Sequence, residues 1–579
     1  MGRVVQICDG RNISTSIEVR NHGQDILARS FYDHSQNLPA RSRFRPLFGS
    51  KKMMHREAKM NNATENSGLI RLDPADNVAV ATKPLKRGQA IDLGGLALVV
   101  AQDIPAGHKI ALDGVQEGEA IVKYGQPIGL VTNKIRPGDH VHTQNLTDHH
   151  VVSDDLSEIN PPPSPERISR TFDGFCRPDG RVGTRNYVAV VSTVNCSATV
   201  CHQVVSRFTK ERMQRWPNVD GVFAVTHTTG CALEYDGLKH RMLGRVLAGY
   251  AQHPNVGGCL VVGLGCEQTT GGYLQQHHGV VSLHAPDGTQ LTRDGGIPML
   301  TMQTEGGTRQ TIGKADALLE QVLDRANQFE RETADASHLS LAVECGGSDG
   351  YSGLTANPAV GVVSDRIVAC GGLSVISETT ELYGAEQLLV RRSRSKEVAR
   401  KLLDRIEWWK EYVGRYGGQI DNNPSVGNKA GGLTTITEKS LGAVSKSGGT
   451  TLEAVFEYGE KMDAHGLVVM DSPGFDPASV TGKVAGGANL VMFTTGRGSC
   501  YGCKPTPVIK IATNTDLFHH MREDMDLNAG SVLEGRDLQS VGDEFFEFAL
   551  RVASGRQTCS EMQGFGDHEF VPWTVGPTV

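Results

Sequence analysis

The chain of 579 residues contains no apolar run approaching the roughly 20 residues that cross a bilayer. Its beginning also lacks the short apolar core of a secretory signal. Basic residues do not outnumber acidic ones, since 58 Lys and Arg stand against 65 Asp and Glu. A general nucleic-acid binder usually shows a basic field, which this sequence does not have. These absences predict a cytoplasmic protein without a membrane or nucleic-acid partner.

Cysteine is also scarce, with 12 in the whole chain, too few for a disulfide scaffold. No Walker A spacing and no dinucleotide fingerprint follows an expected strand, which argues against nucleotide chemistry. Several cysteines stand singly beside glycine and polar residues, a pattern that indicates thiols kept for chemistry or metal in a reducing compartment. Cys201, Cys259 and Cys370 are better interpreted as small buried apolar residues.

The length allows several domains. Residues 1–67 mix basic and polar side chains with little apolar periodicity, which predicts a disordered extension. Between residues 68 and 150, short β-branched runs are separated by turns such as Pro105-Ala-Gly107, and this pattern predicts a small all-β domain. Residues 151–170 are polar and proline-rich, as in a linker.

The remainder repeats an apolar run, a polar loop bearing Gly or Cys, and a helical stretch. Near-continuous apolar strands such as residues 187–192 and 466–470 are typical of parallel sheets covered on both faces. We therefore expect an α/β region with mostly parallel sheets, divided into catalytic subdomains at 171–335 and 336–579. In such sheets ligands bind beyond the carboxyl ends of the strands, where the polar loops fall.

Four cysteines close apolar strands in this way: Cys196, Cys231, Cys266 and Cys345. Together they suggest a metal or thiolate site assembled from several loops, although each thiol alone could simply fill a tight space at a strand end. Their wide spacing matches no compact zinc or iron–sulfur pattern. Cys500-Tyr-Gly-Cys503 is a lone CxxC, which is weak support for metal binding or redox chemistry.

Histidines and cations form a second group of candidates. His140 and His142 stand two apart on an expected strand, so they face the same side and could share a ligand with His108, unless all three are solvated surface residues. Lys429 and Arg497 are single cations in glycine-containing loops, suited to a substrate carboxylate. Carboxylates at strand ends could serve as acids or metal ligands, or could cap the next helix; they are Glu344, Glu378, Glu381 and Asp471.

Long motifs carry a family resemblance: Glu344-Cys-Gly-Gly-Ser-Asp-Gly350, Asn423-Pro-Ser-Val-Gly-Asn-Lys429, Val262-Gly-Leu-Gly-Cys-Glu267 and Phe493-Thr-Thr-Gly-Arg-Gly498. From about Leu69 to the C-terminus the chain resembles the altronate/galactarate dehydratase family. The all-β domain is similar to that family's N-terminal SAF (β-clip) domain through Gly107-His-Lys109 and Lys123-Tyr-Gly-Gln-Pro-Ile-Gly129. The resemblance implies a carbon–oxygen hydro-lyase that uses Fe2+ or Mn2+ to remove water from a hexonate or hexarate.

Within that family, His140-Val-His142, Tyr383-Gly-Ala-Glu386 and Asn428-Lys-Ala-Gly-Gly432 look more like altronate than galactarate dehydratases. The expected reaction is altronate to 2-dehydro-3-deoxygluconate in hexuronate catabolism. Two positions depart from the family pattern, Gln144 and Ser499-Cys-Tyr-Gly502. Galactarate dehydration and a sulfolactate sulfo-lyase-like reaction therefore stay open, as do sugar-acid binding without turnover and a thiol redox role for Cys500 and Cys503.

The resemblance and the residue patterns together give a set of expected site residues. Acid–base or charge-stabilising roles are expected for His108, His140, His142, Lys429 and Arg497. Substrate binding is expected for Lys109, Lys123, Ser348, Asp349, Asn357 and Asn428, and metal ligation for Cys196, Cys231, Cys266 and Cys345. The expected partner is a small anionic sugar acid, and a homo-oligomer is an open alternative.

Overall fold

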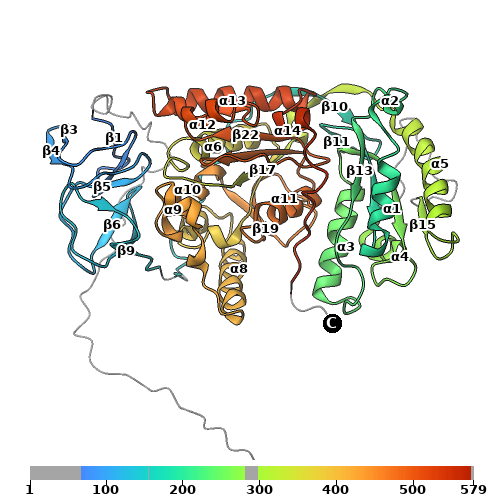
Figure 1. The fold of residues 1–579 in the computed structure, drawn as a ribbon, viewed down its shortest axis with the longest axis horizontal. Coiled ribbons are helices and arrows are strands. Elements are labelled where there is room, and N and C mark those ends of the chain that lie inside the picture. The colour runs from blue at the N-terminus through green and yellow to red at the C-terminus, as the bar shows by residue number, and fades with distance from the viewer. Residues whose placement is uncertain (1–66, 151, 154, 281–297, 576–579) are drawn as a thin grey trace, which may run out of the picture. The chain divides into compact units, whose positions relative to one another are not determined.

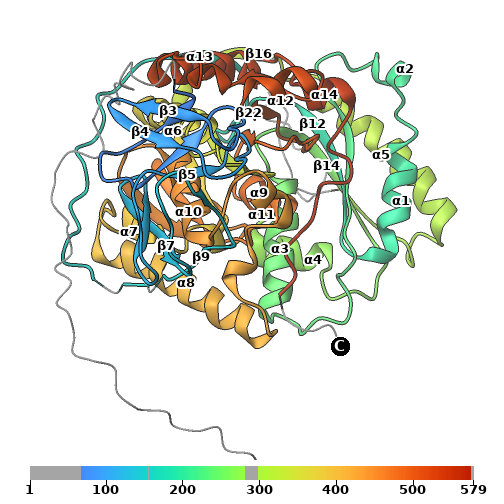
Figure 2. The ribbon, with the colours of Figure 1, turned by 60° about the vertical axis from the view of Figure 1, so that its left-hand side comes forward.

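The computed structural model describes residues 67–150, 152–153, 155–280 and 298–575 (Figures 1 and 2). The extension expected at residues 1–67 therefore lies, up to residue 66, outside the described residues. No helix in these ranges is long and apolar enough to cross a membrane.

The all-β domain consists of short antiparallel strands in three small sheets, with orders β1-β2-β5-β8, β3-β4 and β6-β7-β9. Its own core contains Ile91, Leu98 and Ile110, which are at most 6% exposed. The strands are β1 (Leu69–Ile70), β2 (Val78–Ala81), β3 (Ala90–Leu93), β4 (Leu96–Val99), β5 (Lys109–Ala111), β6 (Ala120–Lys123), β7 (Gln126–Val131), β8 (His140–Val141) and β9 (Leu146–Thr147).

The second region is built on a four-stranded parallel sheet of order β13-β12-β14-β15, and Figure 1 shows helices α1, α3 and α5 alongside it. A three-stranded antiparallel sheet of order β11-β10-β16 accompanies it. The elements are β10 (Thr171–Cys176), β11 (Val182–Gly183), β12 (Tyr187–Ser192), α1 (Asn195–Val205), α2 (Lys210–Met213), β13 (Gly221–Val225), α3 (Leu238–Ala251), β14 (Val256–Gly263), α4 (Gly271–His278), β15 (Met299–Thr301), α5 (Thr308–Ala326) and β16 (Arg331–Asp335).

The C-terminal region contains a seven-stranded parallel sheet of order β19-β20-β18-β17-β21-β22-β23. Its strands are β17 (Ser340–Cys345), β18 (Leu373–Ile376), β19 (Leu452–Phe456), β20 (Gly466–Met470), β21 (Leu490–Thr495), β22 (Val508–Ala512) and β23 (Leu527–Asn528). Its helices are α6 (Ala356–Ala369), α7 (Glu386–Val390), α8 (Lys396–Arg415), α9 (Val426–Ala430), α10 (Ile436–Val444), α11 (Asp476–Ala485), α12 (Thr515–His520), α13 (Leu538–Ala553) and α14 (Cys559–Gln563). The predicted α/β class with a small all-β domain is confirmed.

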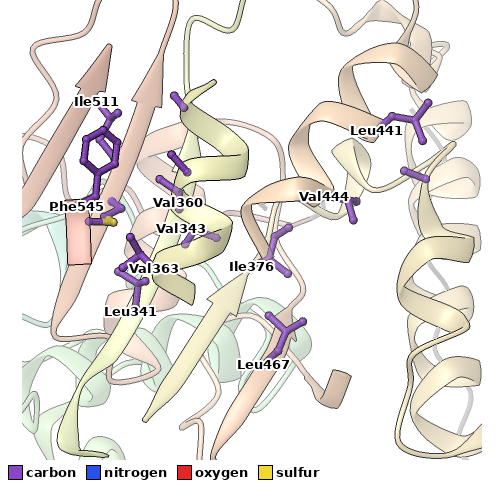
Figure 3. Packing of buried hydrophobic residues seen from close by; sticks show 14 of the residues in the cluster. Leu341, Val343, Val360, Val363, Ile376, Leu441, Val444, Leu467, Ile511 and Phe545 are labelled. Atoms are coloured by element: carbon purple, nitrogen blue, oxygen red, sulfur yellow. The ribbon is translucent and has the colours of Figure 1, made fainter. Parts of the chain in front are cut away.

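Helix α6 shows why these strands are apolar throughout. Its Val360 and Val363 pack beside Leu341 and Val343 of β17 (Figure 3), and all four side chains are fully buried. Every residue of β20 and β21 is buried as well, because helices cover both faces of a parallel sheet. This covering leaves the loops at the strand ends as the places where polar chemistry can occur.

The regions around the two parallel sheets share apolar packing. One buried cluster joins Val191 of β12 to Val468 of β20. Near the end of α3, a Cβ built on Gly249 would lie 2.2 Å from the carbonyl oxygen of Ala485, the last residue of α11. The described part of the proline-rich segment, residues 152–153 and 155–170, forms no helix or strand, but Ile168 donates a backbone hydrogen bond to Ala369 of α6.

Candidate active site

A loop of the all-β domain inserts between two loops of the C-terminal region. A Cβ built on Gly350 would lie 2.0 Å from the carbonyl oxygen of Gly107, and one built on Gly432 would lie 2.2 Å from the same oxygen. Both distances are far below van der Waals contact, so neither position has room for a side chain. This close backbone approach places His108, the next residue, against helix α9.

Three histidines meet at this contact, with ring centroids 4.9–5.3 Å apart. His108 Nε2 lies 3.2 Å from the carbonyl oxygen of Ala430, and His142 Nε2 lies 2.9 Å from that of Lys429. A carbonyl only accepts, so both Nε2 atoms carry the proton. His108 Nδ1 then accepts from His140 Nε2 at 3.0 Å, which leaves Nδ1 of His140 as an acceptor nitrogen.

Burial keeps these imidazoles neutral. It lowers the pKa of His108 and His142, and it lowers the pKa of His140 to about 3, with the neighbouring His108 adding to the effect. The sequence placed His140 and His142 on one side of a strand, and the structure brings His108 to both of them. The group can accept a proton or a ligand, but it does not supply a positive charge at neutral pH.

The two lysines expected to bind substrate have another partner. Lys109 and Lys123 each lie 2.8 Å from the Glu438 carboxylate of α10, and all three side chains are at most 1% exposed. Burial alone would raise the pKa of Glu438, but the two ammonium groups hold it well below its usual range. This ion triplet engages both lysine side chains with one carboxylate, and it attaches β5 and β6 to the C-terminal region.

The loop after β17 carries several of the other expected substrate residues. Asn428 donates from Nδ2 to the carbonyl of Ser348, while Oγ of Ser348 is buried without a partner among the described residues. Asp349 is nearly buried and accepts from Ser352 and Thr513, and burial raises its pKa. Asn428 therefore joins α9 to this loop.

The remaining expected substrate residues differ in exposure. The backbone N–H of Arg497 donates to the carbonyl of Gly347 in the β17 loop. The residue is exposed, so it stands at the edge of the site. Lys429 is half-buried beside the histidines. Asn357 is 1% exposed, and its amide donates to the carbonyl of Gly442 and accepts from the Thr494 hydroxyl. It therefore supports the fold and does not face solvent.

A dense buried cluster of charges lies at the carboxyl ends of β17 and β18. Glu378 pairs with Lys446 at 2.5 Å, Glu381 pairs with Lys439 at 2.6 Å, and Glu344 pairs with Lys483. Cys345 lies among them, its Sγ 3.8 Å from Glu378 Oε1 and 3.9 Å from Glu381 Oε2. Such a concentration of paired charges in the interior is costly, and it is typical of functional sites.

Two carboxyl groups of this cluster titrate near neutrality. Burial raises the pKa of Glu378 to about 7, with repulsion from Glu344 adding to it. Burial also raises the pKa of Asp476 at the start of α11 to about 7, with Glu378 the next cause. The pKa of the Cys345 thiol is raised to about 12, chiefly by burial, so the thiol stays protonated. Groups with pKa values near the working pH are suited to proton transfer.

The cluster also contains side chains of the kinds that bind metal ions. Two sets of donors lie close enough to hold one ion, Cys345 with Glu378 and Glu381, and Glu344 with Glu378 and Asp476. Yet three of these carboxylates already face lysines, so a divalent ion would enter among three ammonium groups. Oε1 of Glu344 is a buried oxygen without a partner among the described residues, so it needs a hydrogen-bond donor rather than a further positive charge beside Lys483. The residues fit acid–base chemistry better than a metal.

The other three expected metal ligands gather in the second region. Cys196, Cys231 and Cys266 are exposed free thiols that follow the adjacent strands β12, β13 and β14, with Cys196 in the first turn of α1 and the other two in loops. Backbone hydrogen bonds tie these loops together, from Asn195 to Thr229 at 2.9 Å and from Gln268 to Gly230 at 3.1 Å. The structure therefore divides the four expected cysteines, because Cys345 ends a strand of a different sheet.

These three cysteines match iron in donor type, although their sulfur atoms do not all lie within 4.8 Å of one another. Free cysteine is usually buried, whereas this thiol trio (Cys196, Cys231 and Cys266) is exposed at one sheet edge. Thiolates bind iron well, while manganese prefers carboxylate and carbonyl oxygen. No lysine–carboxylate pairing of the kind that surrounds Cys345 is present at these thiols among the described residues.

Sequence reasoning named Glu344, Glu378 and Glu381 as strand-end carboxylates but did not select Asp476, Lys439, Lys446 or Lys483. Asp476 begins α11 and reads in the sequence as an ordinary helix-start residue. Glu438 and Lys439 are neighbours on α10 but pair with different parts of the chain. The sequence does not show these partners, so it could not predict either pairing. Of the lone CxxC pair, Cys500 is exposed, while Cys503 is buried against Tyr250.

Parallel sheets with acid–base groups gathered beyond their carboxyl ends define an α/β enzyme. Three family models match consecutive parts of the chain: the altronate/galactarate dehydratase SAF domain at residues 67–149, the D-galactarate dehydratase/altronate hydrolase second domain at 174–327, and the D-galactarate/altronate dehydratase C-terminal domain at 336–578.

Three relatives named for different activities are similar to this chain over most of their length. An altronate dehydratase of Bacillus subtilis is 35% identical over 86% of this chain and 97% of its own. A galactarate dehydratase (L-threo-forming) of Escherichia coli is 34% identical over 87% of this chain and 97% of its own. The beta subunit of a (2R)-sulfolactate sulfo-lyase of Chromohalobacter salexigens is 32% identical over 70% of this chain and 98% of its own.

The chain belongs to the altronate/galactarate dehydratase family. It is an enzyme of the hydro-lyase class.

Proposed function

We propose that this enzyme removes water from a sugar acid, with altronate as its substrate and 2-dehydro-3-deoxygluconate as the product. The observation that carries the proposal is the pair of buried carboxyls, Glu378 and Asp476, whose pKa values both lie at about 7. The similarity to an altronate dehydratase supports the choice of substrate.

Dehydration of a 2,3-dihydroxy acid needs a base for the proton on C2 and an acid for the hydroxyl leaving C3. Two neighbouring carboxyls that repel each other do not lose their protons together, so one is ionised while the other stays protonated. Asp476 and Glu378 meet this requirement, because burial and the charge of Glu378 raise the pKa of Asp476, while burial and the charge of Glu344 raise the pKa of Glu378. Lys446, paired with Glu378, stabilises negative charge that develops beside it.

Substrate binding is assigned to the cations at the open side of the cluster. Lys429 stands in the last turn of α9 and Arg497 in the loop after β21, both next to the β17 turn, and neither is buried. A guanidinium and an ammonium suit a carboxylate, and the unpartnered Oγ of Ser348 is available for a hydroxyl. The neutral histidine group beside Lys429 closes this side of the site.

A metal enters the proposal through the thiol trio. Cys196, Cys231 and Cys266 would hold iron, which supplies Lewis acidity toward a hydroxyl or carboxylate oxygen. The test is the iron content of protein purified without oxygen: the triple Cys-to-Ser variant should lose iron, while Cys201→Ala, on the buried face of α1, should keep it. Equal iron in both variants contradicts this assignment.

The activity itself is tested by offering D-altronate, galactarate and sulfolactate in parallel to protein supplied with ferrous iron or manganese. The readout is a 2-keto-3-deoxy acid, with sulfite followed for sulfolactate. Turnover of altronate alone supports the proposal. Turnover of galactarate would keep the hydro-lyase mechanism and move the specificity to the divergent loop at residues 499–502, whereas release of sulfite from sulfolactate alone would contradict the proposed loss of water. Binding of altronate without turnover by iron-loaded protein contradicts the proposal.

A further inference from the structure

A large cavity lies at the amino ends of both parallel sheets, away from the candidate active site at their carboxyl ends. Its volume is about 750 Å³, within the range of small-molecule sites. Val256 and Gly257 at the start of β14 form one wall, and Ser340 and Leu373 at the starts of β17 and β18 form another. An occupant would therefore touch both α/β regions.

Positive charge dominates the cavity lining. The cations are Arg177, Arg181, Arg245 and Lys461, and the one acidic side chain that lines it among the described residues is Asp179. That carboxylate is already paired with Arg181 at 2.6 Å. The lining thus offers cations without matching anions.

Several polar atoms of the lining are buried without a partner. Within the described ranges, these atoms are Nη1 of Arg177, Nη1 of Arg181, Nε2 of His278 and Oγ of Ser340. Most other buried polar groups in folded proteins have a hydrogen-bond partner. Four such atoms belong to residues that line this one cavity, so its walls are short of hydrogen-bond partners.

Arg177 is the clearest case, because it is 7% exposed and makes no ion pair among the described residues. Its Nε donates to Pro254 at 3.1 Å and its Nη2 to Arg185 at 3.3 Å, and the guanidinium lies 4.5 Å from the Phe329 ring centroid. Burial, together with the charge of Arg181, lowers its pKa to about 9. A buried cation held in place with one donor free is stabilised when an anion binds beside it.

We propose that this cavity is a second ligand site, which binds a small organic polyanion carrying phosphate or several carboxylate groups. The cations and orphaned donors supply the anion contacts. Phe329, Leu373 and Met462 add an apolar wall that an inorganic ion does not need, and the volume exceeds that of a single phosphate. The site is independent of the dehydration proposed above.

The test is isothermal titration of the full chain with two probes, pyrophosphate and citrate. The double variant Arg181→Gln/Lys461→Gln removes two cations from the lining, and both residues stand at its more open side. The matched control, Lys396→Gln/Lys401→Gln, removes the same charge from exposed positions of α8. Wild type and control should bind at least one probe equally, with the lining variant roughly tenfold weaker or worse.

A second measurement separates loss of binding from loss of folding. Each probe that binds should raise the thermal midpoint of wild type and control, because a ligand of the native state stabilises it. The lining variant should keep the unliganded midpoint and lose the shift. Failure of wild type to bind either probe at millimolar concentration overturns the proposal. Equal binding by the lining variant also overturns it, since the anion would then occupy another place, such as the Lys429 and Arg497 loops.

Discussion

Glu378 combines two uncommon properties in one residue. Its backbone is left-handed, with φ at 61°, a conformation that costs a residue other than glycine about 1–3 kcal/mol. Its backbone N–H donates to the hydroxyl oxygen of Ser472 at 2.9 Å, and its carboxylate lies between Cys345 and Lys446. Strain of this kind persists where the surroundings hold a side chain in a required place, here at the centre of the charge cluster.

Replacing Glu378 with Gln should lower kcat by about 100-fold or more, because proton transfer by a placed group contributes that much. The substitution also leaves Lys446 buried without its partner, which destabilises the fold. The double variant Glu378→Gln/Lys446→Met should recover the thermal midpoint without recovering kcat. Steady-state rates and thermal unfolding measured on both variants check this, and a single variant with kcat near wild type would contradict it.

Asp476 predicts a pH dependence of stability. Its pKa rises from 3.8 when unfolded to about 7 when folded, so the folded state holds the proton more tightly. Its contribution to stability is therefore fully present below about pH 4 and is lost as the pH rises through about 7. The Asp476→Asn variant cannot ionise, and its thermal midpoint relative to wild type should be higher at pH 8 than at pH 5. A difference that does not change with pH would rule out this shift.

At the scale of elements, helix α10 connects two parts of the enzyme through consecutive residues. Glu438 pairs with Lys109 and Lys123 of the all-β domain, while Lys439 pairs with Glu381 in the charge cluster. One turn of helix therefore carries both the docking of the all-β domain and the electrostatics of the site.

Glu438→Gln should destabilise the protein by roughly 3–5 kcal/mol, because it leaves two buried ammonium groups without a counter-charge. The histidine group should separate from α9 at the same time, since β5 and β8 carry it. Lys86→Ala, which breaks an exposed ion pair with Asp103, should leave the midpoint unchanged. Thermal unfolding of both variants checks the prediction, and equal midpoints would show that the triplet does not hold the domain.

The sequence predicted elements better than their partners. Apolar runs and turns indicated the strands and the parallel sheets, and the spacing of His140 and His142 indicated their shared side. The sequence did not predict that Lys109 pairs with Glu438, because 329 positions separate the two residues. A lysine in a buried ion pair also cannot be told from a surface lysine by sequence alone. An apolar strand followed by a thiol occurs in both parallel sheets. This pattern therefore could not show that Cys345 belongs to a different sheet from Cys196, Cys231 and Cys266.

At the scale of the whole molecule, the two α/β regions behave as one packed body where α3 meets α11. Gly249→Ala places a methyl group 2.2 Å from the Ala485 carbonyl and should cost about 1–3 kcal/mol by overpacking. Gly313→Ala, at an exposed position of α5 with open space around it, should instead stabilise by roughly 0.5–1 kcal/mol. Opposite shifts in thermal midpoint are expected, and a midpoint of Gly249→Ala that equals or exceeds that of wild type would contradict the packing described.

The contact among Gly107, Gly350 and Gly432 has a consequence for how this architecture diverges. The two surfaces fit together because glycines have no side chains, so main chain packs directly against main chain. Neighbouring positions can therefore change without a compensating change across the contact, as long as these glycines stay. A search for pairs of positions that change together would pass over this junction. Any alanine there would separate the two parts and move His108 away from helix α9.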